Sequence, residues 1–126
     1  MHGLDVLVVE DDREASEMMT LVLSERGARV RTAADYDSAL RAVQQAWPDV
    51  LVSDIGLPGR DGYELVRRLR ELEQERCAPH LPVIALTAFA RAEDRQKTLD
   101  AGFDLHLSKP LKPHQLLDAI SRCCRS

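Results

Sequence analysis

The residues best suited to chemistry in this sequence follow short apolar runs, and the central example is Asp54. Asp54 comes directly after the strand-like segment 50–53 and precedes segment 56–62, whose glycines and proline break regular structure. A carboxylate at the carboxyl end of a buried strand, facing a glycine-rich loop, lies where open α/β sheets place their chemistry. Taken alone, Asp54 could equally well cap the loop through a hydrogen bond to the backbone.

Three other apolar runs end in polar residues in the same way. These polar residues are Glu10 with Asp11, Thr87, and Lys109. The carboxyl ends of parallel strands lie along one edge of a sheet, so these side chains would meet there if all four runs are parallel strands. Four coincidental loop caps would explain such a convergence poorly, and we therefore favour a functional site.

The chemistry of such a site follows from its charges. Two carboxylates about 4 Å apart repel by about 4 kcal/mol at an effective dielectric near 20. A hard divalent cation with few protein ligands, which is typical of Mg²⁺, would offset this repulsion. The charge of Lys109 and the hydroxyl of Thr87 suit the oxygens of a phosphoryl group. Because no Ser-His or Cys-His pair is visible, a carboxylate would be the nucleophile, and Asp54 is the best candidate.

The elements that must position these residues alternate between strands and helices. The predicted strands are 4–9, 29–33, 50–54, 83–87 and 105–108. The predicted helices have apolar faces within 15–23, 36–47, 65–72, 91–101 and 113–124. This fivefold βα pattern predicts a parallel sheet covered on both faces, with 29–33 as an edge strand because of its charges. Helix 91–101 has few large apolar residues, chiefly Leu99, so we expect it to be loosely held.

Length and composition exclude several classes of function. The 126 residues suffice for one domain, 1–126, and 44% hydrophobic with 30% charged residues is typical of a soluble globular domain. No apolar run is long enough to span a membrane, and no signal peptide follows Met1. A net charge of −4 with scattered Lys and Arg argues against nucleic-acid binding. Three cysteines, an odd number, fit a reducing cytoplasm better than a disulfide framework.

Taken together and in order, the motifs resemble the receiver domain of bacterial two-component response regulators and hybrid sensor histidine kinases. The matching motifs are Val8-Val9-Glu10-Asp11-Asp12, Asp54-Ile55-Gly56-Leu57-Pro58 with Asp61-Gly62, Leu86-Thr87-Ala88, Ala101-Gly102 and Lys109-Pro110. The resemblance implies a flavodoxin-like sheet in the order 2-1-3-4-5. It also implies that Asp54 accepts phosphate from a phosphohistidine of a histidine kinase or histidine phosphotransfer domain, and that the domain catalyses its own phosphorylation and dephosphorylation.

The resemblance also assigns the metal ligands. Asp11 and Asp54 would bind Mg²⁺ through their carboxylates and Gly56 through its backbone carbonyl, and Mn²⁺ could substitute for Mg²⁺. Glu10 would assist through a water molecule.

The phosphoryl group would be held by residues at the ends of the last two strands. By resemblance, Thr87 would bond a phosphoryl oxygen after switching, and Ala88 would be small enough to leave it room. Lys109 would pair with the phosphoryl group, and the Lys109-Pro110 bond would be cis. The face around the fourth helix, the fifth strand and the fifth helix would then change its packing and act as the output surface.

Two features depart from the commonest family pattern. His106 occupies the position where the family usually has a Tyr or Phe switch residue. Histidine also has a flat ring, so its rotamer could still be coupled to the position of Thr87. Gly56 lies two residues past Asp54, where many relatives have a polar side chain, and Phe89 lies two past Thr87. We therefore predict that these two positions do not assist hydrolysis of the phospho-aspartate.

Other polar residues have simpler interpretations. Asp12 and Asp61 are predicted to be a helix cap and a turn residue rather than metal ligands. His2, His80 and His114 lie in polar, loop or helix-start settings, where we expect them to be solvated.

Two other functions fit the residues of this sequence less well. An aspartyl-nucleophile phosphohydrolase generally begins with Asp-x-Asp on its first strand, whereas this chain has Glu10-Asp11 and no cap domain. A receiver used only for protein contacts would not need the complete set of site residues. With no effector domain after Ser126, we expect a stand-alone regulator or a receiver taken from a hybrid kinase, which loop 57–61 and segment 87–112 resemble more. The sequence leaves the oligomeric state open.

Overall fold

The structure, a computed structural model, describes residues 2–88 and 92–124 and has the predicted alternation of strands and helices. The strands are β1 (Asp5–Val9), β2 (Arg29–Ala33), β3 (Val50–Asp54), β4 (Val83–Thr87) and β5 (Leu105–Ser108). The helices are α1 (Arg13–Glu25), α2 (Tyr36–Gln45), α3 (Gly62–Arg76), α4 (Ala92–Ala101) and α5 (Pro113–Cys123). All pairings are parallel and the strand order is β2-β1-β3-β4-β5, so the predicted flavodoxin-like topology, with β2 at one edge, is confirmed.

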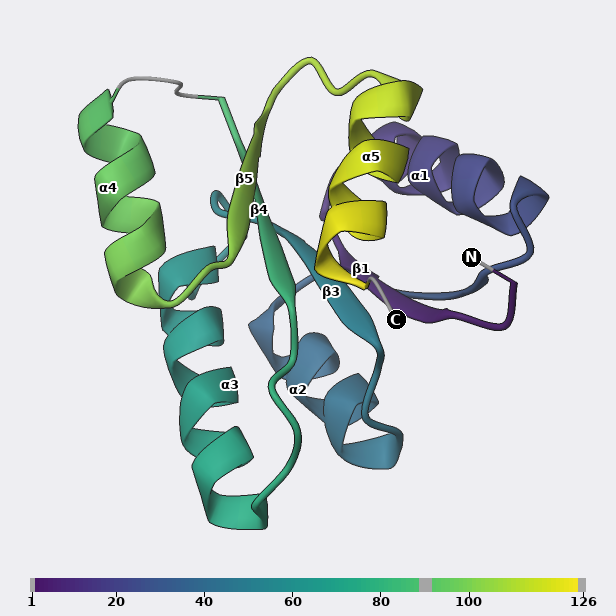
Figure 1. The fold of residues 1–126 in the computed structure, drawn as a ribbon. Coiled ribbons are helices and arrows are strands. Elements are labelled where there is room, and N and C mark those ends of the chain that lie inside the picture. Colours follow the sequence, from purple (N-terminus) through teal and green to yellow (C-terminus); the bar gives the residue numbers. More distant parts are fainter. Residues whose placement is uncertain (1, 89–91, 125–126) are drawn as a thin grey trace.

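Helices cover both faces of the sheet (Figure 1). Val6 and Val8 of β1 pack with α1 and α5, whereas Leu7 and Val9 pack with α2 and α3 on the other face. Helix α4 lies beside α3 and β5. Successive side chains of a strand point to opposite faces, and both faces are covered by helices. The central segments 6–9, 50–52 and 83–86 are therefore apolar and buried on both sides.

Three aspartates start the helices that follow β1, β2 and β3. The side chains of Asp12, Asp35 and Asp61 accept hydrogen bonds from backbone N–H groups of the first turn at 3.1, 2.8 and 3.0 Å. Asp12 is therefore the predicted cap, and Asp61 caps α3 as well as turning the chain. A Cβ atom at Gly62 would lie 2.6 Å from the carbonyl oxygen of Asp54, so only glycine allows α3 to start this close to β3.

Helix α4 differs from the other helices in how little of it is buried. Among its residues 94–101, the buried side chain is Thr98, and Leu99 is 50% exposed. The sparse packing predicted for this helix is thus present over 94–101, although the buried residue there is a threonine. No helix within the described ranges combines the length and the apolar character needed to cross a membrane.

Candidate functional site

Lys109 and Asp54 form the centre of the site at the carboxyl ends of the strands. The Lys109 Nζ atom lies 2.8 Å from Asp54 Oδ2 and 3.1 Å from Glu10 Oε1. The other carboxylate oxygen of Asp54 accepts a hydrogen bond of 3.1 Å from the backbone N–H of Gly56. Asp54 comes from β3, Glu10 follows β1 and Lys109 follows β5, so the parallel sheet brings together residues that are up to 99 positions apart.

Three carboxylates gather beside this lysine. Oxygen atoms of Glu10, Asp11 and Asp54 lie within 4.8 Å of one another. Glu10 and Asp54 are buried, whereas Asp11 is exposed. Glu10 Oε2 is buried and has no hydrogen-bond partner among the described residues. A buried polar atom without a hydrogen-bond partner costs folding free energy, so this oxygen indicates that a ligand binds here.

The buried carboxylates do not share their charge equally. Burial raises the pKa of Glu10 to about 7, and contact with Asp54 adds to the rise, against the lowering effect of Lys109. Burial also favours the neutral form of Asp54, but its contacts with Glu10, Lys109 and the Gly56 N–H outweigh this and lower its pKa. Near neutral pH, Asp54 is therefore the ionised member, as a nucleophile must be.

Thr87 and His106 lie on neighbouring strands next to this cluster. Thr87 is buried at the end of β4, directly after Leu86, the cross-strand partner of Asp54. His106 pairs with Ala85, so its side chain shares a face of the sheet with Thr87. Burial, together with the charge of Arg95, lowers the pKa of His106. Its Nε2 atom is buried without a hydrogen-bond partner in the described part of the chain.

The loops around the site confirm one expectation directly. The Lys109-Pro110 peptide bond is cis, as predicted. Ala88 is exposed directly after Thr87. Phe89, which we expected to flank the attacking water, lies outside the described residues.

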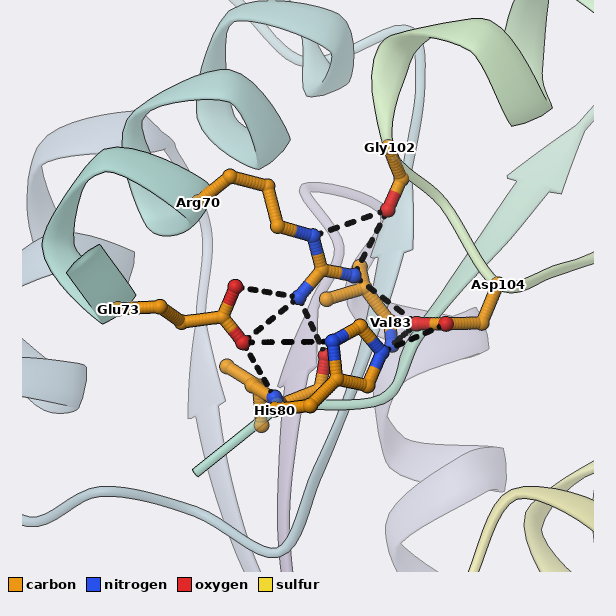
Figure 2. A network of polar contacts seen from close by, with 7 residues as sticks. Arg70, Glu73, His80, Val83, Gly102 and Asp104 are labelled. Atoms are coloured by element: carbon orange, nitrogen blue, oxygen red, sulfur yellow. Dashed lines mark hydrogen bonds and ion pairs between the residues drawn. The ribbon is translucent and has the colours of Figure 1, made fainter. Parts of the chain in front are cut away.

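Sequence reasoning missed a second polar cluster, which Figure 2 shows. His80, expected to be solvated, has Nε2 2.7 Å from Asp104 Oδ1 and Nδ1 3.6 Å from Glu73 Oε2. Arg70 lies between the same two carboxylates. His80 is exposed, as expected, but its carboxylate contacts were not foreseen. These residues belong to three different segments, and no local pattern signals their contact. The excess of charged residues in α3 was the only available hint.

A family model described as the response regulator receiver domain matches residues 6–121. The chain belongs to this family. Receiver domains are the phosphoacceptor modules of two-component signalling, and phosphorylation of an aspartate is their general function.

Relatives of this receiver domain cover almost its whole length. It is 40% identical to an uncharacterized 14.6 kDa protein of Leptolyngbya boryana, over 96% of this chain and 90% of that one. It is 36% identical to the phosphate regulon transcriptional regulatory protein PhoB of Escherichia coli, covering 95% of this chain but only about half (51%) of PhoB. The structure of the chemotaxis response regulator CheY4 of Vibrio cholerae matches with a TM-score of 0.88 and 32% identity, over 96% of this chain and 98% of CheY4.

Proposed function

We propose that this receiver domain accepts a phosphoryl group on Asp54 from a phosphohistidine of a histidine kinase or histidine phosphotransfer domain. The observation that supports this proposal is the contact of Asp54 with both Lys109 and the Gly56 N–H, beside the carboxylates of Glu10 and Asp11. In this arrangement the ionised Asp54 is the nucleophile at the carboxyl ends of the strands, and the ammonium group of Lys109 lies beside it.

The donor set fits Mg²⁺. The three carboxylates supply the hard oxygen ligands that Mg²⁺ prefers, and one of these oxygens, Glu10 Oε2, is buried without a hydrogen-bond partner among the described residues. In our proposal Asp11 and Asp54 bind the ion through their carboxylates, Gly56 through its carbonyl and Glu10 through water. When bound, the ion would neutralise the acidic cluster and the oxygens of the incoming phosphate. Mn²⁺, which accepts the same ligands, could replace it.

The residues of the chain then have separate tasks in the transfer. The bond between phosphorus and the imidazole nitrogen of the donor breaks, and a bond between phosphorus and an Asp54 oxygen forms. Lys109 passes from the carboxylate to the phosphoryl oxygens and stabilises their charge. The Thr87 hydroxyl donates to one of these oxygens, and Ala88 leaves space for them.

Phosphorylation by acetyl phosphate with Mg²⁺, followed by weighing of the intact protein, tests this proposal. We expect the wild-type chain to gain the mass of one phosphoryl group and Asp54→Asn to gain none. Asp12→Asn is the matched control, because Asp12 neighbours the cluster but caps α1, and asparagine caps a helix equally well. An adduct of undiminished amount on Asp54→Asn would refute the assignment.

A further inference from the structure

Among residues 94–104, helix α4 is attached to the rest of the molecule much more firmly at its C-terminal end than along residues 94–101. Of its residues 94–101, Thr98 is buried, but its hydroxyl bonds to the carbonyl of Asp94 in the same helix. A side contact to α3 comes from Lys97, whose Nζ lies 4.7 Å from the centre of the Tyr63 ring. Flexible surface contacts of this kind contribute little and allow a helix to shift.

The C-terminal end of α4 is instead held by Arg70 of α3 (Figure 2). The carbonyl oxygen of Gly102 accepts hydrogen bonds from Nε and Nη2 of Arg70 at 3.1 and 2.7 Å. Arg70 Nη2 also donates to Asp104 Oδ2 at 2.9 Å, just before β5 starts. The guanidinium group therefore bridges both sides of the turn that joins α4 to β5.

The rest of the network holds Arg70 itself in place. Its Nη1 atom donates to both carboxylate oxygens of Glu73 at 2.9 Å and to the carbonyl of Leu81 at 2.7 Å. His80 contacts the same Glu73 and Asp104, and Asp104 also accepts from the backbone N–H of Val83. The Arg70 side chain is only 21% exposed, and all three of its guanidinium nitrogens are engaged. A planar, fully bonded group of this kind fixes geometry better than a single ion pair.

This network lies at the amino-terminal ends of the strands, opposite the carboxyl-terminal ends where Asp54 lies. It touches the starts of β4 and β5, whereas the Asp54 site lies at the strand ends. Helix α4 thus runs from the side of the sheet where β4 ends to the side where β5 begins (Figure 1).

We infer that Arg70 is a positioning residue that makes the C-terminal end of α4 a fixed pivot. Phosphorylation of Asp54 then displaces the N-terminal part of α4, while the turn at 101–104 stays in place. This inference rests on the proposed function, because it assigns to that site the element that moves in response.

Hydrogen exchange of the backbone amides tests the pivot. The full chain is compared in Mg²⁺ alone and in Mg²⁺ with beryllofluoride, which mimics an acyl phosphate. In the wild-type chain we expect exchange to change within 92–97 and to stay the same within 101–105. In Arg70→Lys, whose ammonium group cannot reach Gly102, Leu81 and Glu73 at once, we expect the beryllofluoride response to spread into 101–105 by about threefold or more.

Arg68→Lys is the matched control, because Arg68 lies on the same helix but pairs, within the described part of the chain, with Glu71 and Glu75 of that helix alone. This variant should keep the wild-type pattern. If Arg70→Lys does not fold, Asp104→Ala removes one arm of the bridge and should give the same spread. It deletes Oδ2, which accepts from both Arg70 Nη2 and the Val83 N–H.

The outcomes separate the pivot from the phosphorylation site. If Arg70→Lys exchanges faster at 101–105 to the same extent with and without beryllofluoride, Arg70 only stabilises the fold and the pivot is refuted. A wild-type response that already includes 101–105 refutes it as well. No response anywhere in the wild-type chain, with no phosphoryl adduct in the mass measurement, would overturn the proposed function and the pivot with it.

Discussion

At the scale of single residues, Gly56 leaves space beside the carboxylate of Asp54. A Cβ atom at Gly56 would lie 3.9 Å from Asp54 Oδ1, an ordinary contact distance. Position 56 could therefore carry a side chain next to a phosphoryl group on Asp54. With glycine there, this position offers no side-chain amide or carboxylate to orient an attacking water, so the phospho-aspartate should be long-lived.

Gly56→Asn should shorten the lifetime of the phospho-aspartate by about tenfold, because an amide that orients water supplies part of the gain typical of general acid–base groups. The decay of the phosphorylated mass after removal of acetyl phosphate measures this lifetime. Gly56→Ala fills the same space without a polar group and should decay at the wild-type rate. An unchanged lifetime in Gly56→Asn would show that position 56 does not limit hydrolysis.

Residues that end strands could be predicted from the sequence, whereas residues that meet through loops could not. Asp54 and Lys109 each follow an apolar run, and parallel strands bring such ends together whatever the details of packing. His80 and Asp104 meet only because the loops before β4 and β5 lie side by side, which no periodicity encodes. Burial of Thr98 rather than Leu99 similarly depends on the rotation of α4 against its neighbours.

At the scale of the elements, the end of α3 contains a strained residue. Cys77 follows the helix in the left-handed conformation, with φ 50° and ψ 39°, and is exposed. Residues with a Cβ pay about 1–2 kcal/mol for this conformation, which is why helices commonly place glycine there. The sequence could not reveal the strain, because a cysteine gives no helix-stop signal.

Cys77→Gly should therefore stabilise the protein by about 0.5–1 kcal/mol, since the greater freedom of glycine in the unfolded chain offsets part of the relief. Thermal unfolding should show a melting temperature raised by about 3 °C for a chain of this size. Cys77→Ala removes the thiol but keeps the Cβ atom, so its melting temperature should stay near the wild-type value. An equal gain in both variants would trace the effect to the thiol rather than to the backbone.

The positions of the helices and strands could be predicted from local sequence signals. The alternation of apolar runs, and the stops at Gly27, Pro48 and Gly102, located each strand and helix. What the pattern could not supply is the unequal attachment of α4, because the bonds of Arg70 to Gly102 come from a helix about 30 residues earlier.

At the scale of the whole molecule, the sheet buries a carboxylate where its strands end, and this burial costs stability. Glu10 has a pKa of 4.5 when unperturbed and about 7 in the fold, where burial is the main cause of the rise. Between these values the folded state binds the extra proton, so this group makes the free energy of unfolding fall as the pH rises from about 4.5 to about 7. The destabilising effect becomes complete only well above pH 7, where Glu10 is fully ionised in the fold, and a bound cation can offset it.

Mg²⁺ should accordingly raise the melting temperature, and more so at pH 8 than at pH 6, where a proton on Glu10 competes with the ion. At a Mg²⁺ concentration ten times the dissociation constant, the gain should be about 1.4 kcal/mol, or a few degrees. Without Mg²⁺, Glu10→Gln should melt above the wild-type chain at pH 8, and this difference should shrink toward pH 5. Glu17→Gln, an exposed site on α1, should show neither effect. If the difference between Glu10→Gln and wild type were the same at both pH values, the ionised Glu10 would not be the source of the lost stability.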